Sequence, residues 1–219
     1  MEKTIKKQVE DLLRKRDLER LIDLCEKDRH YWQEVRFRLY DLDENISWAA
    51  IQTVAKLMHR WWQSGKEDKV RQYIRTLFWS MNDESGGIGW SAPQTIAEII
   101  LYIPEIIEPY GRMMIAHSLD EPPLVKGGLW GIGRLGRRVT DAVALFKDKI
   151  LTIFSIDDFE TLGLASWAMG EARFTPAGPF LEQLRSSAES VKIYMGNDFL
   201  EKPLGKWAQE ALAKINISL

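Results

Sequence analysis

A tryptophan followed by a small residue recurs along this chain at nearly regular intervals. The tryptophans of successive copies are 42, 40, 37 and 40 residues apart, and the five copies are Trp48-Ala49, Trp90-Ser91, Trp130-Gly131, Trp167-Ala168 and Trp207-Ala208. A period near 40 residues without the alternation typical of strands predicts stacked helix pairs. We therefore expect an all-α chain that forms a right-handed α-solenoid of about five helix pairs.

The repeat extends beyond the tryptophans. Residues 52–57 read Gln-Thr-Val-Ala-Lys-Leu and residues 94–99 read Gln-Thr-Ile-Ala-Glu-Ile, so the two segments match almost position for position. The first 43 residues contain no copy of the Trp-small pair, which is typical of an atypical terminal repeat. We predict an N-terminal helical cap over 1–43 and one continuous repeat array over 44–219.

Apolar residues at helical spacing indicate where the helices lie. The cap is predicted to hold helices over 3–15, 18–27 and 31–42. The first helix of each pair is predicted over 43–62, 90–102, 124–135, 159–170 and 204–215, and the second over 69–80, 110–119, 140–154 and 179–188. No stretch predicts a strand. We expect the second helices to line the concave face of the solenoid.

Helix packing gives the Trp-small pair a physical reason. Helices pack about 8–10 Å apart, so a small side chain lets two backbones approach while a neighbouring large one fills the groove beside it. All five residues that follow the tryptophans are Ala, Ser or Gly. The pattern therefore predicts that the five indole rings are buried between helices.

Charge and composition narrow the possible partners. The 30 basic and 32 acidic residues leave a net charge of −2, so no global field attracts nucleic acid or anionic lipid. The single cysteine, Cys25, allows no intrachain disulfide and is expected to be a buried structural thiol. The first residues lack the apolar core of a signal peptide, and no window approaches the roughly 18 apolar residues of a membrane span. We predict a cytoplasmic protein without a membrane association, a monomer or a weak homo-oligomer.

Two glycine- and alanine-rich runs resemble a known repeat. Residues 128–136 read Gly-Leu-Trp-Gly-Ile-Gly-Arg-Leu-Gly, and residues 164–172 read Leu-Ala-Ser-Trp-Ala-Met-Gly-Glu-Ala before Thr175-Pro176-Ala177. Over about residues 46–215 the chain resembles the HEAT-repeat family, in particular its short phycobiliprotein-lyase-like type, and residues 81–90 resemble a stretch of uncharacterised bacterial HEAT proteins. The resemblance implies paired helices and, for most such arrays, a binding scaffold.

An acidic, glycine-rich loop is the richest polar site in the sequence. It contains Asn82, Asp83, Glu84 and Ser85 before two glycines, and its oxygens are of the kind that bind divalent cations. The ligand alternation of an EF-hand is absent, however, and the same residues also suit a helix cap and a turn, or a contact with a partner. We take Asn82, Asp83, Glu84 and the adjacent Trp90 as candidate partner-binding residues.

A second set of candidates lies one helical turn after each tryptophan. Residues four apart share a helix face, so these positions form a column along a stacked array, either as a structural ladder or as a polar binding groove. The column consists of Gln52, Gln94, Arg134, Glu171 and Ala211. Of these, Gln94, Arg134 and Glu171 are further candidates for partner binding.

No catalytic pattern accompanies these candidates. His30, His59 and His117 lie in distant segments without the spacing of metal ligands, and no Ser-His-Asp or Cys-His arrangement is suggested. The sequence therefore predicts no catalytic residues, no metal and no cofactor.

The leading interpretation is a non-catalytic scaffold that binds another protein on its concave face. One alternative is a HEAT-like DNA glycosylase of the alkylation-repair type, with Trp61, Trp62, Trp79 and Asp83 around an extruded nucleotide. That function requires a basic track for the phosphates, which a net charge of −2 does not favour, so nucleic acid is not the expected partner. A bilin lyase or chaperone is the other alternative, and it follows from the family resemblance.

Overall fold

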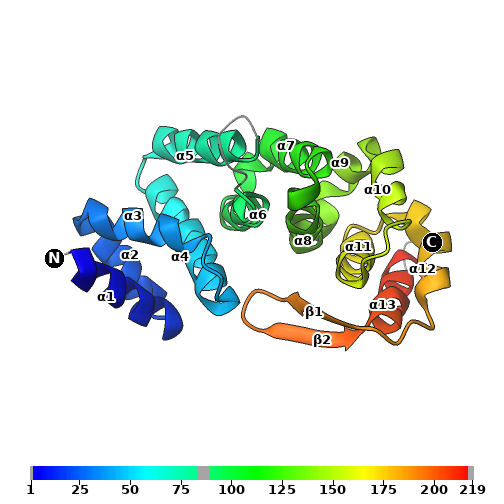
Figure 1. The fold of residues 1–219 in the computed structure, drawn as a ribbon. Coiled ribbons are helices and arrows are strands. Elements are labelled where there is room, and N and C mark those ends of the chain that lie inside the picture. The colour runs from blue at the N-terminus through cyan, green and yellow to red at the C-terminus, as the bar shows by residue number, and fades with distance from the viewer. Residues whose placement is uncertain (1, 83–88, 217–219) are drawn as a thin grey trace. The chain divides into compact units, whose positions relative to one another are not determined.

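The computed structural model describes residues 2–82 and 89–216, and nearly all of its regular structure is helical. The chain divides into two compact units, Met1–Pro104 and Glu105–Leu219 (Figure 1). The predicted boundary after residue 43 separates a cap from an array by type of repeat, and it stays a prediction.

The N-terminal unit is built around α4. This helix contacts the five other helices of the unit. The helices are α1 (Glu2–Arg14), α2 (Leu18–Lys27), α3 (Arg29–Arg38), α4 (Glu44–Gln63), α5 (Glu67–Ser80) and α6 (Ala92–Tyr102), drawn from blue to green in Figure 1.

In α2 and α5 the apolar stripe read from the sequence is the buried face of the helix. In α2 the buried residues are Leu18, Leu21, Ile22 and Cys25, and in α5 they are Val70, Tyr73, Ile74, Leu77 and Phe78, as predicted. Each set recurs at three- and four-residue intervals, so a helix places it on one side.

Local signals end and begin the helices at the expected places. Asp43 accepts a hydrogen bond from the Asn45 backbone N–H at 3.0 Å and so caps α4. Gly65, with φ of +75°, follows the end of α4 in a backbone conformation that glycine adopts without strain. One prediction is wrong: α3 ends at Arg38, so Leu42 leaves the apolar stripe and is 93% exposed.

Cys25 shows how tightly α2 is packed. Its side chain is buried, and burial, followed by the nearby Glu26 carboxylate, raises the pKa of the thiol to about 12. Because the thiolate is the reacting species, we expect the thiol of the native protein near pH 8 to resist Ellman's reagent. In guanidinium-unfolded protein the thiol is expected to react fully and to release one equivalent of thionitrobenzoate. Rapid labelling of the native chain would contradict this burial.

The raised pKa of Cys25 also makes the stability of the fold depend on pH. Below about pH 9 the thiol is neutral in both the folded and the unfolded chain, so it does not change the free energy of unfolding. As the pH rises from about 9 toward 12, only the unfolded chain loses the proton, so the free energy of unfolding falls.

The C-terminal unit is built around α11, which packs against α8 and α13. Its α-helices are α7 (Ile107–Asp120), α8 (Val125–Leu135), α9 (Thr140–Leu145), α10 (Lys147–Ile153), α11 (Phe159–Glu171), α12 (Gly178–Leu184) and α13 (Leu204–Asn216). Short 3-10 turns connect them at Pro104–Ile106, Pro122–Leu124, Gly136–Val139 and Thr175–Ala177. The single helix predicted over 140–154 is divided at Phe146, whose φ and ψ of −107° and 23° lie outside the helical region.

The expectation that no strand exists is wrong. Strands β1 (Ser190–Tyr194) and β2 (Phe199–Pro203) form an antiparallel hairpin in which Val191 faces Lys202 and Ile193 faces Leu200. Val191 and Ile193 are buried while Lys192 is exposed, which is the alternation of a strand with one covered face. The turn between the strands contains Gly196 at φ +98°.

The hairpin accepts hydrogen bonds from two of the repeat tryptophans. Trp130 Nε1 donates a hydrogen bond to the Tyr194 carbonyl at 2.7 Å, and Trp207 Nε1 donates one to the Val191 carbonyl at 3.1 Å. Val191 also lies so close to α11 that a Cβ on Gly163 would be 2.4 Å from its side chain. The backbone of β1 therefore accepts hydrogen bonds from indole groups of α8 and α13.

The five repeat tryptophans differ between the two units. Trp130, Trp167 and Trp207 are buried as predicted, but Trp48 is only half-buried and Trp90 is 50% exposed. Trp90 precedes α6, which begins at Ala92, so its ring is not fixed within a helix–helix contact.

Close helix approaches in the C-terminal unit occur three residues after two of these tryptophans. A Cβ on Gly133 would be 2.5 Å from the Trp167 ring, and one on Gly170 would be 2.6 Å from the Ala211 backbone. Small residues therefore allow neighbouring helices to approach at these two positions, and the packing role predicted for the residue directly after each tryptophan stays a prediction.

Candidate functional site

The N-terminal unit contains a groove between α3 and α5, which we call the α3–α5 groove. Its volume is about 690 Å³, within the range of sites that hold small ligands or anchoring side chains. Ile5 of α1 also lines it. The remaining lining residues are His30, Gln33, Glu34, Arg36, Phe37, Leu39, Tyr40, Tyr73, Thr76, Leu77 and Ser80.

Aromatic rings give the groove a rigid base. Tyr73 packs edge-on against Trp32 with ring centroids 5.1 Å apart, and Trp32 packs edge-on against Trp61 at 5.6 Å. The Arg36 guanidinium lies 5.8 Å from the Tyr73 ring centroid and 5.9 Å from that of Trp32. Burial raises the pKa of Tyr73, so its phenol stays neutral and the base of the groove carries no negative charge.

Phe37 separates the groove from a second hollow. This second hollow, of about 460 Å³, shares Glu34, Phe37 and Tyr40 with the α3–α5 groove and is otherwise lined by Lys3, Lys6, Arg38 and Asp41. We call it the basic hollow. Phe37 lines both spaces and is 79% exposed, so a ligand that lies across it reaches both.

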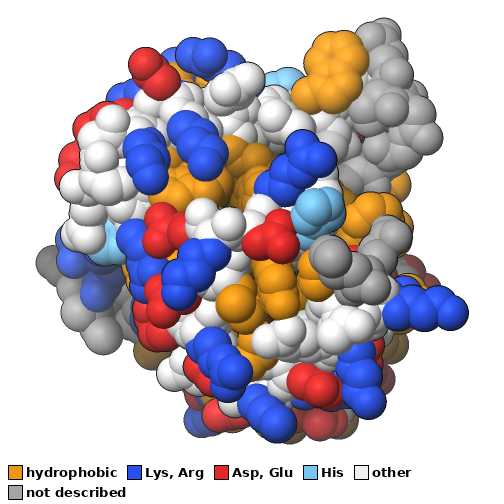
Figure 2. Space-filling view, turned by 90° about the vertical axis from the view of Figure 1, so that its left-hand side faces the viewer, with side chains coloured by type: hydrophobic (Ala, Val, Ile, Leu, Met, Phe, Trp, Pro, Cys, Tyr) orange, Lys and Arg blue, Asp and Glu red, His pale blue; other side chains and the backbone are white. Residues whose placement is uncertain are grey.

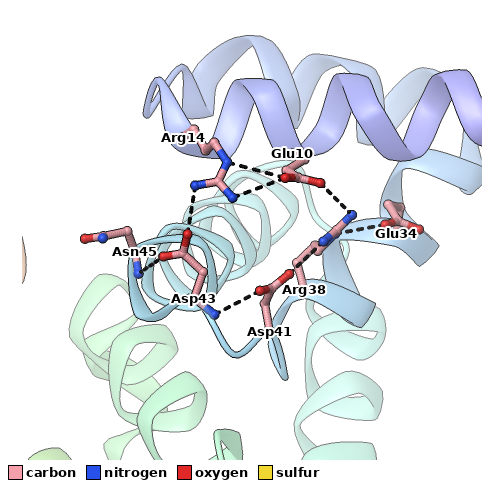
Figure 3. A network of polar contacts seen from close by, with 7 residues as sticks. All are labelled: Glu10, Arg14, Glu34, Arg38, Asp41, Asp43 and Asn45. Carbon is pink, nitrogen blue, oxygen red and sulfur yellow. Dashed lines mark hydrogen bonds and ion pairs between the residues drawn. The ribbon is translucent and has the colours of Figure 1, made fainter.

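An arginine-centred network fixes α3 beside these hollows. The Arg38 side chain, 11% exposed, lies 2.9 Å from Glu34, 2.6 Å from Asp41 and 3.4 Å from Glu10. Figure 3 shows these contacts joining α1, α3 and the segment before α4. The Arg38 guanidinium is thus paired with carboxylates within the unit, so its role at this site is structural.

The same network extends to the start of α4. Arg14 bridges Glu10 and Asp43, and Asp41 accepts a hydrogen bond from the Asp43 backbone N–H at 3.0 Å (Figure 3). Burial alone would raise the pKa of Asp41, but the Asp43 N–H and the Arg38 guanidinium outweigh it and hold that pKa below its usual value. Asp41 therefore stays ionised at neutral pH.

Large apolar side chains are exposed around the groove. Phe37, which lines the groove, is 79% exposed, and Trp90 is 50% exposed, whereas Trp79 of α5, 64% exposed, is not a lining residue. Figure 2 views the molecule from the side of the first helices and shows hydrophobic side chains reaching the surface among charged ones. Clustered exposed apolar groups of this kind mark interaction sites more often than isolated ones do.

One of the candidates predicted from the sequence lies at this site. The Trp90 ring packs edge-on against Tyr40, a groove residue, with centroids 5.4 Å apart. Asn82 is half-buried at the end of α5, where its backbone N–H donates to the Trp79 carbonyl at 3.2 Å. Asp83 and Glu84 lie outside the described residues. Gln94 is half-buried in α6, and its Oε1 has no hydrogen-bond partner among the described residues.

The remaining candidates belong to the C-terminal unit. Glu171 accepts hydrogen bonds from Trp167 Nε1 at 3.0 Å and from Lys214 Nζ at 2.5 Å, so it joins α11 to α13. The Arg134 guanidinium lies against Gly196 of the hairpin turn, 2.8 Å from where a Cβ would be. In the C-terminal unit, two residues of the column that follows the tryptophans thus connect neighbouring elements: Glu171 joins α11 to α13, and Arg134 packs against the hairpin turn.

The residues proposed for a glycosylase do not line the α3–α5 groove. Trp61 is 4% exposed and has the Lys69 ammonium 3.3 Å from its ring centroid, and Arg71 lies 5.1 Å from the Trp62 ring centroid. Trp79 is on the surface of α5, and Asp83 lies outside the described residues. None of the described residues of this set lines the α3–α5 groove or the basic hollow.

The residues that make the groove, apart from Trp90 at its edge, were missed from the sequence. Arg36 and Phe37 lie off the apolar stripe of α3, and an aromatic residue on the polar side of a helix was the available signal.

Comparison with known proteins supports the fold and leaves the activity open. No family model matches the chain. A protein of Archaeoglobus fulgidus, named only as an uncharacterized protein, is 27% identical over 167 residues, which cover 76% of this chain and 87% of that protein. A designed armadillo repeat protein superposes with a TM-score of 0.55 at 18% identity, covering 97% of this chain and 99% of its own. The fold is an α-solenoid. The likeness to an armadillo repeat protein confirms the helical-repeat architecture that the HEAT resemblance implied, without selecting the phycobiliprotein-lyase-like type.

Within residues 2–82 and 89–216, no three His, Cys, Asp or Glu side chains are grouped as a metal site would need. The same part of the chain contains no helix with the length and apolarity required to cross a bilayer.

Proposed function

We propose that this protein is a non-catalytic binding scaffold whose N-terminal unit holds a segment of a partner protein in the α3–α5 groove. The observation that carries the proposal is the groove itself, about 690 Å³ in volume, with the exposed Phe37 at its edge. Protein interfaces depend on a few large apolar or aromatic anchors in such pockets. An α-solenoid fold is compatible with this role.

The position of the groove agrees with part of the sequence interpretation. Helix α5 is one of the second helices expected to line a concave binding face, and it supplies Tyr73, Thr76, Leu77 and Ser80 to the groove. A concave face formed by all the second helices remains part of the proposal. So do the phycobiliprotein-lyase-like repeat type, which rests on the runs at 128–136 and 164–172, and the cytoplasmic location.

Selection of displayed peptides tests the proposal directly. Random peptides of about 12 residues are selected on the immobilised chain, and the enriched ones are synthesised with a fluorescent label for anisotropy titration. We expect Phe37→Ala to weaken their binding at least about tenfold, because a large anchor in an interface is worth about 1.4 kcal/mol or more. Phe37 is mostly exposed, so its loss changes folding stability by no more than about 0.5 kcal/mol.

Leu42→Ala is the matched control. Leu42 is in the same unit and 93% exposed, and it lines neither hollow. This variant is expected to bind like the wild type. If no peptide is enriched, or if every enriched peptide binds Phe37→Ala as well as the wild type, the groove is not the binding site and the proposal is wrong.

A further inference from the structure

The charges around Phe37 indicate what kind of segment the groove accepts. Among the described residues, the carboxylates that line the two hollows are Glu34 and Asp41, and both are paired with Arg38. The other lining cations, Lys3, Lys6 and Arg36, form no ion pair with the described residues. The lining also contains one histidine, His30, whose Nδ1 atom lies 2.7 Å from a carboxylate oxygen of Asp28.

These cations lie on both sides of Phe37. Lys3 and Lys6 line the basic hollow, whereas Arg36 lines the apolar α3–α5 groove. The Arg36 guanidinium faces two aromatic rings at about 6 Å and forms a side-chain hydrogen bond with Tyr73, so the cation is held in place at the wall of the groove. Unpaired cations beside an apolar groove favour a ligand of opposite charge.

We propose that the ligand of the α3–α5 groove is an acidic protein segment, with a large apolar side chain for the groove and nearby carboxylates for Arg36, Lys3 and Lys6. This inference rests on the proposed function. A segment that crosses Phe37 places its apolar residue and one carboxylate in the α3–α5 groove, beside Arg36, and its other carboxylates in the basic hollow, beside Lys3 and Lys6. Charge complementarity then determines which apolar segments bind and how fast they associate.

A nucleic acid fits these hollows less well. A phosphate backbone needs a continuous row of cations, whereas here Glu34 and Asp41 are placed among them. The carboxylates of a peptide are separated along its chain, so they can pair with the cations without lying next to Glu34 and Asp41, which would repel them.

The selected peptides provide the test. We expect the peptides enriched on the wild-type chain to combine a large apolar residue with at least about two Asp or Glu residues, because three exposed cations are available. Replacing the acidic residues of the best peptide by Asn and Gln is expected to weaken binding about tenfold. Raising the salt from about 50 mM to about 500 mM is expected to weaken it similarly, because exposed ion pairs are screened.

A charge-reversed variant and a matched control assign the effect to this site. Lys3→Glu combined with Lys6→Glu and Arg36→Glu is expected to bind the acidic peptide at least about tenfold more weakly. The triple replacement by Gln is expected to lie between that variant and the wild type. The control reverses three exposed cations of the C-terminal unit, Arg112, Lys147 and Lys206, which gives the same net charge, and it is expected to bind normally.

The outcomes separate this inference from the proposed function. Peptides that depend on Phe37 but carry no excess of acidic residues would leave the scaffold proposal standing and overturn the acidic ligand. A labelled oligo(dT) of about 20 nucleotides that binds through Phe37, Lys3 and Lys6 more tightly than any peptide would overturn it as well. Loss of Phe37-dependent peptide binding altogether would remove both proposals.

Discussion

Replacing Trp130 with Ala is expected to destabilise the C-terminal unit by about 3–5 kcal/mol, because the ring is 2% exposed and its removal leaves a large cavity. The indole also packs against Tyr194, with ring centroids 6.5 Å apart, and donates a hydrogen bond to the Tyr194 carbonyl. Trp130→Phe keeps most of the ring and removes the donor, so we expect a smaller loss of about 1–3 kcal/mol. Urea denaturation followed by far-ultraviolet circular dichroism measures both losses.

Trp90→Ala is the comparison for this prediction. Both tryptophans begin a Trp-small pair, but Trp90 is half exposed, so its removal is expected to cost less than about 1.5 kcal/mol. A loss under about 1 kcal/mol for Trp130→Ala, or equal losses for the two variants, would show that the hairpin and the helices do not bury Trp130 as described.

Replacing Arg38 with Met is the second large perturbation. The change keeps much of the volume but leaves Glu10, Glu34 and Asp41 near one another without their shared cation. Removing one partner of a buried ion pair costs about 3–5 kcal/mol, and because these carboxylates are partly exposed we expect roughly 2–3 kcal/mol at neutral pH. Arg75→Met, at an exposed position of α5, is the control and is expected to change stability by less than about 0.5 kcal/mol.

The pH dependence of the Arg38 variant gives an independent check. In the wild type the pKa of Asp41 is below its usual value, so the stability it contributes is present above about pH 4 and is lost as the pH falls through the lowered pKa. Without Arg38 the carboxylates are easier to protonate, which relieves their repulsion. The deficit of the variant is therefore expected to be largest near pH 7 and to shrink toward pH 3. A deficit independent of pH would assign the loss to packing instead.

The helical fold was predictable because it depends on local periodicity. The stripes of α2 and α5 were identified residue by residue, since apolar residues three and four apart lie on one face of a helix. Trp130, Trp167 and Trp207 were correctly expected to be buried, whereas Trp48, which also lies within a helix, is only half-buried.

The errors have identifiable physical causes. Trp90 precedes its helix instead of lying within it, so the repeat pattern alone misjudged its burial. The hairpin was missed because each of its strands has only five residues, too few for an alternation to stand out against the surrounding helices.

The groove depends on a different kind of information. It is formed by α1, α3 and α5, which are brought together by tertiary packing and by Arg38, and no periodicity within a single helix encodes that arrangement. Phe37, on the polar side of α3, was the one local sign of it.

The hydrogen bonds from the tryptophans to β1 affect how the C-terminal unit unfolds. In most repeat proteins each repeat contacts only its neighbours, so an array can fray from its ends, one repeat at a time. Here the bond from Trp130 to Tyr194 joins residues 64 positions apart, and the Trp207 bond anchors the same strand to the last helix. Release of the terminal helix would also disturb α8, so this half of the chain should melt in a single cooperative transition.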